Sequence, residues 1–300
     1  MSARTAVHHV PRGPRTAEVP AVPPAVRSGS QSRSGVEPLL GVESRSHVQP
    51  LPSVEGLPGP LAPPGEAAQS LRAHRDAFSR GHFLRVVNWH NTPASAADSL
   101  RHQLARYARA FAPVGLADLD RFYETGAWHL PRPGFMPVFY EGYRNSAEVA
   151  GPILDELGLT GWFFICTGFL DTPPPQQEAF ARAHYIGLVQ EDLDRDRPIA
   201  MTWDQVRDLS TRHVVTPHTA SHESVAWIRS DEDIEREIIE PKRRMDAVTG
   251  QDSACFAWLA GTHYGHDPVN DEAVRRAGYR YVFSNTMIQR LPRPSHGSTR

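Results

Sequence analysis

The chain has 300 residues, of which 40% are hydrophobic, which is enough for one large packed domain or two small ones. Its formal net charge of -2 lacks the basic surplus that nucleic-acid-binding proteins normally carry, so we expect no nucleic-acid partner. No run of about 18 apolar residues occurs, so the sequence predicts no membrane-spanning helix.

The N-terminal part of the chain differs in composition from the rest. All aromatic residues lie after Ala77, whereas 12 of the 27 prolines lie between Pro11 and Pro64. A segment without aromatic side chains buries too little apolar surface to offset the entropy of ordering it. We therefore predict a disordered, Pro-rich tail over residues 1–80 and a folded domain over residues 82–294. Because the N-terminus has no apolar signal-peptide stretch, we expect a cytoplasmic protein.

From residue 82 onward, strand-like and helix-like patterns alternate. Apolar runs predict strands at residues 83–89, 136–140, 161–168, 213–219, 254–261 and 279–286. Helical spacing predicts helices at residues 92–111, 146–158, 202–210, 230–250 and 270–278. This alternation is typical of an α/β fold with a parallel sheet, either a (β/α) barrel or a doubly wound sheet. A polar, Pro-rich insertion at residues 171–198 is expected to cross the rim and to influence substrate choice.

Individual residues mark where several of these helices begin and end. Thr202 and Ser230 are expected N-caps, and Gly158 and Gly250 are expected at C-terminal ends. Pro241 should kink the helix that contains it.

The two cysteines lie in apolar, strand-like runs. Cys166 stands in FFICTG and Cys255 in ACFAW. Buried free thiols are the favoured interpretation, with a disulfide as the alternative.

Residue types that carry chemistry gather after the predicted strands. In parallel α/β folds, functional residues lie at the C-terminal ends of strands, so these side chains should share one face. They are Asn88, Trp89, His90, Tyr140, Glu141, Thr167, Thr216, His218, His222, Trp258 to Gly261, His263 and His266.

The stretch HTASH contains two histidines, His218 and His222, four residues apart. Among this many histidines, about one such pair is expected by chance. The pair alone is therefore also explained by histidines on the surface or in the core that bind no metal. Two imidazoles with one carboxylate form the commonest open catalytic zinc site, and zinc polarises a carbonyl and lowers the pKa of its bound water. Glu141, before Gly142, is the candidate third ligand. On spacing alone, a solvated loop acid is an equal alternative.

These motifs together resemble the polysaccharide deacetylases, also called the NodB-homology or carbohydrate esterase family four enzymes. VFYEGY, GPILDELG and WFFICTGF resemble the family's TFDDGY strand, its PIL helix and its FFxxTGF strand. HTASH matches its H-S/T-x-x-H motif, through His218, Thr219 and His222. CFAWLAG resembles its FAYPYG strand, and AVRRAGYRYVFSNT resembles its closing segment. The resemblance covers roughly residues 82–294.

The resemblance implies a distorted (β/α) barrel of the polysaccharide deacetylase type that hydrolyses N- or O-acetyl groups of a carbohydrate. It implies one divalent cation per domain, usually Zn²⁺, held by Glu141, His218 and His222. The oxyanion of the reaction would be held by the cation and by the backbone N–H of Ala260.

The sequence departs from the family where the chemistry is concentrated. Tyr140 and Glu141 stand in place of Asp-Asp, whose first member is the family's general base and whose second binds the metal. A tyrosine with an ordinary pKa of about 10 is a poor base at neutral pH. The family's late acid histidine has no clear counterpart: His296 lies in a polar tail, whereas His263 and His266 are closer to the site and can transfer protons, or are simple loop residues.

Two functional hypotheses follow. The first is a metal-dependent hydrolase acting on an acetylated carbohydrate, with catalytic Tyr140, Glu141, Ala260 and His263. The second is a catalytically degenerate member that binds a glycan or protein partner without turnover. The Tyr-Glu replacement favours the second, and the intact HTASH motif favours a retained metal.

Overall fold

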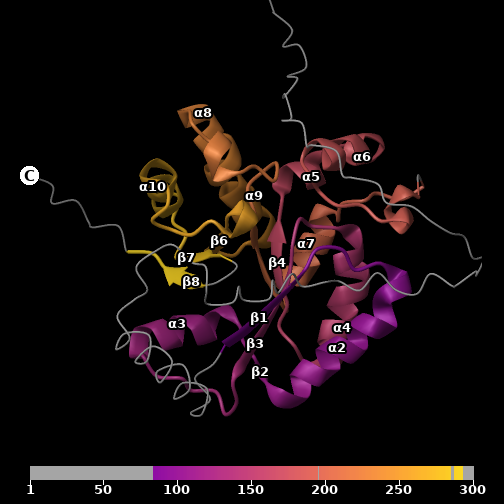
Figure 1. Ribbon diagram of the computed structural model, residues 1–300, viewed down its shortest axis with the longest axis vertical. Helices are drawn as coiled ribbons and strands as arrows, with labels where there is room; N and C mark the ends of the chain where they lie inside the picture. Colours follow the sequence, from indigo (N-terminus) through magenta and orange to yellow (C-terminus); the bar gives the residue numbers. More distant parts are fainter. Residues whose placement is uncertain (1–83, 195, 285–286, 293–300) are drawn as a thin grey trace, which may run out of the picture. The chain divides into compact units, whose positions relative to one another are not determined.

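The computed structural model describes residues 84–194, 196–284 and 287–292 (Figure 1). The predicted tail at residues 1–80, the predicted domain limits at residues 82 and 294, and His296 lie outside the described residues. Within the described part of the chain, no helix has both the length and the apolar character needed to cross a membrane.

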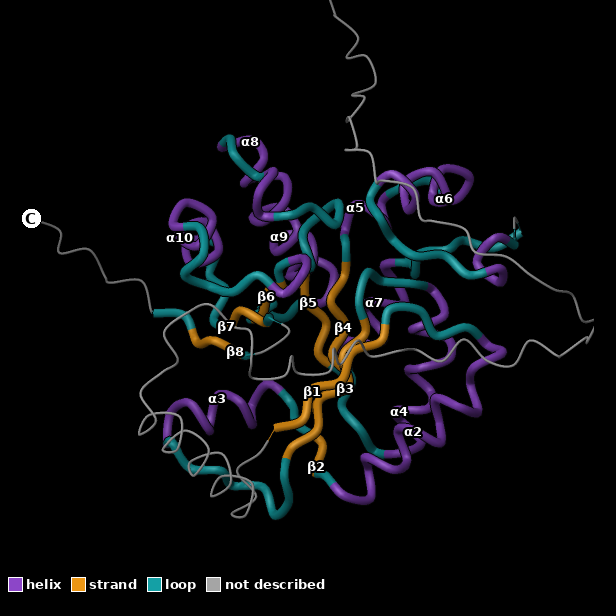
Figure 2. The backbone as a smooth tube through the Cα atoms, viewed as in Figure 1, coloured by secondary structure: helices purple, strands orange, loops and turns teal. Residues whose placement is uncertain are grey.

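The strands form two sheets, drawn in orange in Figure 2. The larger sheet is parallel in the order β1-β3-β4-β5, with β2 paired to β3. Its strands are β1 (Leu84–Trp89), β2 (Ala112–Pro113), β3 (Gly134–Phe139), β4 (Trp162–Ile165) and β5 (Val214–Pro217). The smaller sheet pairs β6 (Cys255–Ala257) parallel to β7 (Tyr281–Phe283), and β7 antiparallel to β8 (Ile288–Arg290).

A side chain links the two sheets. The hydroxyl of Thr216 in β5 donates a hydrogen bond to the carbonyl of Cys255 in β6. Within the described residues, no backbone strand pairing joins β5 to β6, so the strands form two sheets and the barrel is distorted. The predicted α/β class with parallel strands is confirmed.

Helices cover the outside of the strands, and Figure 1 shows α2 and α4 side by side. The α-helices are α2 (Ala97–Ala110), α3 (Leu116–Thr125), α4 (Gly151–Leu157), α5 (Thr167–Asp171), α6 (Pro174–Ala183), α7 (Trp203–Ser210), α8 (Asp231–Ile234), α9 (Glu240–Thr249) and α10 (Pro268–Arg276). Short 3-10 segments are η1 (Ala94–Ala96), η3 (Gln190–Leu193), η4 (Val225–Trp227) and η6 (Leu259–Gly261), and π-helical segments are η2 (Ser146–Ala150) and η5 (Glu235–Ile239).

The central strands are buried on both faces, as parallel strands covered by helices usually are. In β4, Trp162 and Phe164 pack into the core between the two sheets, together with Met136 and Val138 of β3. The alternate side chains pack against the helices in a second core that contains Phe135, Phe139, Phe163, Ile165, Leu104, Leu154 and Leu209. Because β1, β3, β4 and β5 run parallel, the residues that follow these strands lie at the same end of the sheet.

Most local predictions are confirmed, with specific differences. Thr202 and Ser230 cap their helices by accepting from Gln205 N and Asp233 N, and both cysteines are buried and free. The last predicted helix begins at Pro268 with Asp267 as N-cap, not at residue 270, because the Asp267 carboxylate accepts from two backbone amides. A π-helical segment, η5, ends just before Glu240-Pro241, so the missing N–H of proline falls in the first turn of α9. The sequence did not predict β2, β8, α3, α5 or α6, and the strand predicted over residues 161–168 ends at Ile165 because α5 begins at Thr167.

Candidate active site

Residues from the carboxyl ends of four strands line one open cavity of about 560 Å³. His90 follows β1, Glu141 follows β3, His218 follows β5 and Trp258 follows β6. The segment between α6 and η3 completes the wall with Tyr185, Gly187, Leu188 and Val189. The predicted strand-end residues Thr167 and Thr216 are buried and do not line the cavity.

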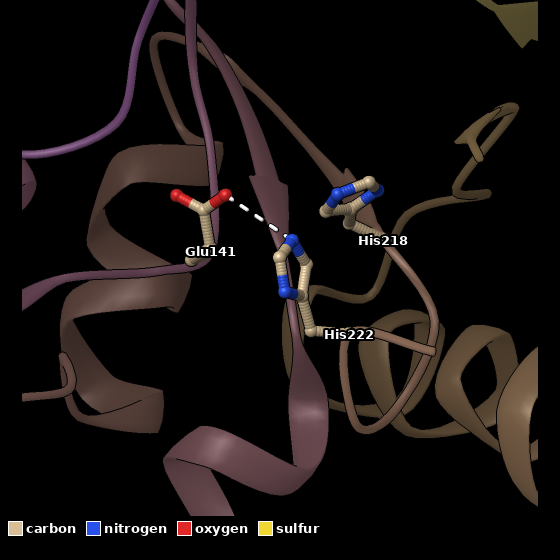
Figure 3. Close-up of side chains that lie close together, drawn as sticks. All are labelled: Glu141, His218 and His222. Atoms are coloured by element: carbon tan, nitrogen blue, oxygen red, sulfur yellow. Dashed lines mark ion pairs between the residues drawn. The ribbon is translucent and has the colours of Figure 1, made fainter. Parts of the chain in front are cut away.

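Glu141, His218 and His222 form a group that could hold a metal ion. One ligand atom from each residue lies within 4.8 Å of the others. His222 Nε2 lies 3.5 Å from Glu141 Oε1, and Figure 3 shows the His222 ring between the Glu141 carboxylate and the His218 ring. Two ligands at about 2.1 Å from a tetrahedral zinc ion are about 3.4 Å apart, which the distance between His222 Nε2 and Glu141 Oε1 matches.

Backbone carbonyls fix both imidazoles in the tautomer that a metal requires. His218 Nδ1 donates to the carbonyl of Ala257 at 2.6 Å, and His222 Nδ1 donates to the carbonyl of His184 at 2.8 Å. Each Nε2 is therefore left with a lone pair, as in typical metal-binding histidines. Burial lowers the pKa of His218 to about 3, with the neighbouring His222 adding to the effect, so the ring is neutral at pH 7.

His90 is the charge partner of Glu141. Its Nδ1 lies 2.8 Å from Glu141 Oε1 and 3.1 Å from Oε2. The hydrogen bond to Glu141, with the charge of that carboxylate, raises the pKa of His90 against the opposing effect of burial. Because Glu141 is only 1% exposed, this contact compensates a carboxylate that water hardly reaches.

Tyr140 packs its ring against the site and keeps its proton. The ring stacks on His90 and on Phe164, with both centroid distances at 5.4 Å, and lies 5.0 Å from the His218 ring. Burial, and then the charge of Glu141, raise the pKa of Tyr140 above its ordinary value of 10.0. Its hydroxyl is therefore protonated at neutral pH and cannot accept a proton as a base.

Strained backbone is concentrated at this site. In the described part of the chain, the non-glycine residues with positive φ are Glu141, Tyr185, Thr219, His222 and Ala260. Four of them line the cavity, and Thr219 lies between the two histidines. Non-glycine residues in this conformation cost free energy and collect at functional sites, so the clustering supports a functional role for the cavity.

The loop that carries the two histidines is held by a buried acid, Glu237 of η5. Its Oε2 accepts from the backbone N–H of Ala220 at 3.1 Å and of Ser221 at 2.9 Å, and its Oε1 accepts from the Ser221 hydroxyl at 2.8 Å. The side chain is 1% exposed. The π-helical segment thus positions a carboxylate that orders the turn between His218 and His222.

The remaining predicted site residues fall into two groups. Ala260 lines the cavity in η6, with φ 55°, and its oxyanion contact stays a prediction. His263 and His266 are exposed residues with ring centroids 6.2 Å apart, and neither lines the cavity. Their roles in proton transfer stay predictions.

Sequence reasoning missed three contributors to the site. The sequence places His90 at a strand end but does not pair it with Glu141. It gives no prediction for Glu237, although an acid on the buried face of an amphipathic helix indicates a carboxylate with hydrogen-bond partners. Tyr185 belongs to an insertion without periodicity, so no sequence pattern indicated its place at the cavity.

Comparisons with known proteins agree with this fold. Residues 135–282 match the family model of polysaccharide deacetylase. No curated protein sequence matches the chain significantly.

Three solved structures resemble the described domain at low sequence identity and therefore show the fold alone. The deacetylase PplD of Streptococcus pyogenes in complex with acetate is 13% identical, with a TM-score of 0.50 over 66% of this chain and 80% of that chain. IcaB from Ammonifex degensii is 20% identical, with a TM-score of 0.50 over 67% and 83%. A de-N-acetylase from Aggregatibacter actinomycetemcomitans is 16% identical, with a TM-score of 0.50 over 69% and 90%. Residues 135–282, about half of the chain, therefore form a NodB-homology domain of the polysaccharide deacetylase family.

Proposed function

We propose that the protein is a metal-dependent hydrolase that removes N- or O-acetyl groups from a carbohydrate, with Zn²⁺ as its cation. The observation that carries the proposal is the convergence of Glu141, His218 and His222 at a cavity formed by strand ends. The family whose model matches residues 135–282 supports the reaction type, and the donor set of one carboxylate and two imidazoles is typical of catalytic zinc.

The three ligands would hold the cation, which would polarise the acetyl carbonyl and activate water when bound. The backbone N–H of Ala260, which lines the same cavity, would orient the acetyl oxygen. With Glu141 on the cation, proton transfer would fall to His90, which is hydrogen-bonded to Glu141, because Tyr140 keeps its own proton. His263 would have to move into the cavity to serve as the acid.

Acetate release tests this proposal. Purified full-length protein, supplied with zinc, is incubated with acetylated chitooligosaccharide and with acetylxylan, and acetate is measured. We expect release by the wild type and a loss of at least about 100-fold in His222→Asn. This variant keeps a donor for the His184 carbonyl and suits the positive φ at position 222, so folding should survive. Equal rates in both proteins would contradict a role for His222.

Binding without turnover is the second candidate function, and Tyr140 is the observation that favours it. A protonated tyrosine stands where the resemblance implies a carboxylate base. The test is a double variant, Tyr140→Asp with Glu141→Asp. If acetate is released only by the double variant while the wild type still binds the oligosaccharide, the natural protein is a binder with a decayed active site.

A further inference from the structure

We propose that Tyr185 is an aromatic platform on which a sugar ring of the substrate packs at the mouth of the cavity. Tyr185 lines the same cavity as Glu141 and His222, yet it is 89% exposed. This inference rests on the carbohydrate substrate class of the proposed function, and it assigns a specific binding contact to that site.

The backbone of Tyr185 has a strained, left-handed conformation, so holding the ring at this position costs conformational free energy. Helix α6 ends at Ala183 with His184 as its C-cap, and Tyr185 follows with φ 57°. The N–H of Ile186 donates to the carbonyl of Ala181 at 2.8 Å, which is the hydrogen bond of a Schellman motif. The position held by Tyr185 in this motif is normally a glycine, because a side chain is strained there.

Packing within the described domain offers no compensation for that strain, since the ring is almost fully exposed. A residue that breaks a local rule at a cavity wall, without a stabilising contact of its own, points to a contact with a ligand. An aromatic side chain also has few rotatable bonds, so little conformational entropy is lost when it binds.

The segment that carries Tyr185 is fixed on both sides. The carbonyl of His184 accepts from His222 Nδ1 at 2.8 Å, which ties the platform directly to a metal-ligand candidate. Further along, the carbonyl of Gly187 accepts from the Tyr143 hydroxyl at 2.6 Å, and the N–H of Val189 donates to Asp192 at 2.9 Å. The platform is therefore preorganised relative to the proposed reaction centre.

The chemistry of the cavity favours a neutral, hydroxyl-rich ligand. A sugar ring combines a C–H-rich face, which packs on an aromatic ring, with hydroxyl groups that need polar partners. Asn88 and His90 supply polar side chains in the same cavity. Neither lysine nor arginine lies among the described lining residues, so a phosphorylated or strongly anionic ligand is not favoured.

Binding of chitopentaose and of acetylated xylopentaose to the full-length protein tests the platform, with affinity measured by calorimetry and unfolding by thermal scans. We expect Tyr185→Gly to weaken binding of at least one oligosaccharide by about 3- to 10-fold. The same variant should keep or raise Tm, because glycine relieves the positive φ. Tyr185→Phe keeps the ring and should bind as the wild type does. Tyr185→Asn tolerates the backbone conformation without the ring and should repeat the loss.

Trp227→Ala provides the matched control. Trp227 is an exposed aromatic residue, 67% accessible, that does not line the cavity, so its removal should leave affinity unchanged. Wild-type affinity in both Tyr185→Gly and Tyr185→Asn overturns the platform even if acetate is released. Binding that depends on Tyr185 without acetate release overturns only the hydrolase proposal. A wild type that binds neither oligosaccharide overturns the platform together with the substrate class.

Discussion

The Nδ1 atom of His90 lies within hydrogen-bond distance of both carboxylate oxygens of Glu141, at 2.8 Å and 3.1 Å. The two residues are 51 positions apart and meet because β1 and β3 are parallel neighbours that end in register at Trp89 and Phe139. Each residue then follows its strand into the cavity. The contact fixes the direction of a buried carboxylate that the proposed metal site needs.

Removal of this contact should weaken metal binding. We expect His90→Ala to lower zinc affinity by about 10- to 100-fold, because Glu141 loses the donor that orients it. His90→Asn places an amide donor near the position of Nδ1 and should restore part of the affinity. A competition titration with a chelating indicator measures both. Unchanged affinity in His90→Ala would show that His90 does not position the ligand.

Glu237 should matter for both stability and metal affinity. Glu237→Gln removes the carboxylate charge and replaces one acceptor oxygen with a donor in a group that accepts from two backbone amides, a hydroxyl and the Arg236 guanidinium. We expect a loss of about 1–3 kcal/mol in the free energy of unfolding, together with weaker zinc binding. Denaturant unfolding and zinc titration provide the measurements.

Glu235→Gln is the matched control for Glu237, since Glu235 lies in the same π-helical segment but pairs with Arg243 on the surface. An exposed ion pair contributes at most about 1 kcal/mol, and zinc affinity should not change. If the two variants behave alike, the buried carboxylate does not order the histidine loop.

Gly142 should resist substitution. Its φ is +91°, and a Cβ added there would lie 2.9 Å from Leu170 Cδ1 and 3.0 Å from Ile165 Cγ2. We expect Gly142→Ala to destabilise the domain by at least about 1 kcal/mol and to displace the adjacent Glu141. Gly158 also has a positive φ, +62°, but a Cβ added there would meet no atom within 4 Å. Gly158→Ala should therefore lower the free energy of unfolding by less than Gly142→Ala does. Equal losses would mean that the contacts of Gly142 do not matter.

The neutral state of His218 predicts a pH dependence of stability in the metal-free protein. Its folded pKa of about 3 lies below the ordinary value of 6.5, so between these values the unfolded chain binds more protons. Protonation of His218 in the unfolded chain therefore lowers the free energy of unfolding as the pH falls from about 6.5 towards 3, and above pH 6.5 it has no effect. We expect His218→Asn to reduce the slope of unfolding free energy against pH by up to about 1.4 kcal/mol per unit in that range.

His90 acts in the opposite direction, because its folded pKa is raised by Glu141. Its contribution to stability is present below the ordinary pKa and is lost as the pH rises through the raised value. The difference in this slope between wild type and His218→Asn gives the effect of His218 apart from that of His90, which both proteins contain. An unchanged slope between about pH 4 and 6 would contradict a buried neutral His218.

Much of the fold follows from the sequence, because its signals are local. The buried strands β3 and β4 carry apolar side chains on both faces, and Gly158 and Gly250 end their helices with φ of 62° and 69°. By contrast, β2 has two residues and β8 has three half-buried ones, so neither produces a readable pattern.

The residues of the candidate site could also be predicted from the sequence, but the contacts between them could not. Residue type and position at strand ends indicated Glu141, His218 and His222. The partner of Glu141 depends on which strands are neighbours, and periodicity does not give strand order. The wall at residues 185–189 depends on tertiary contacts, such as those of the Gly187 carbonyl with Tyr143 and of the His184 carbonyl with His222, which leave no trace in local sequence.

Zinc stoichiometry of the full-length protein is the most direct test of the central claim, measured by elemental analysis after zinc loading and desalting. We predict about one zinc ion per chain in the wild type and a strong loss in His218→Asn, with the two proteins equal in circular dichroism. The asparagine amide can still donate to the Ala257 carbonyl while the metal-binding Nε2 is removed. A wild type that binds no metal, or a variant that binds as much as the wild type, would contradict the proposed site.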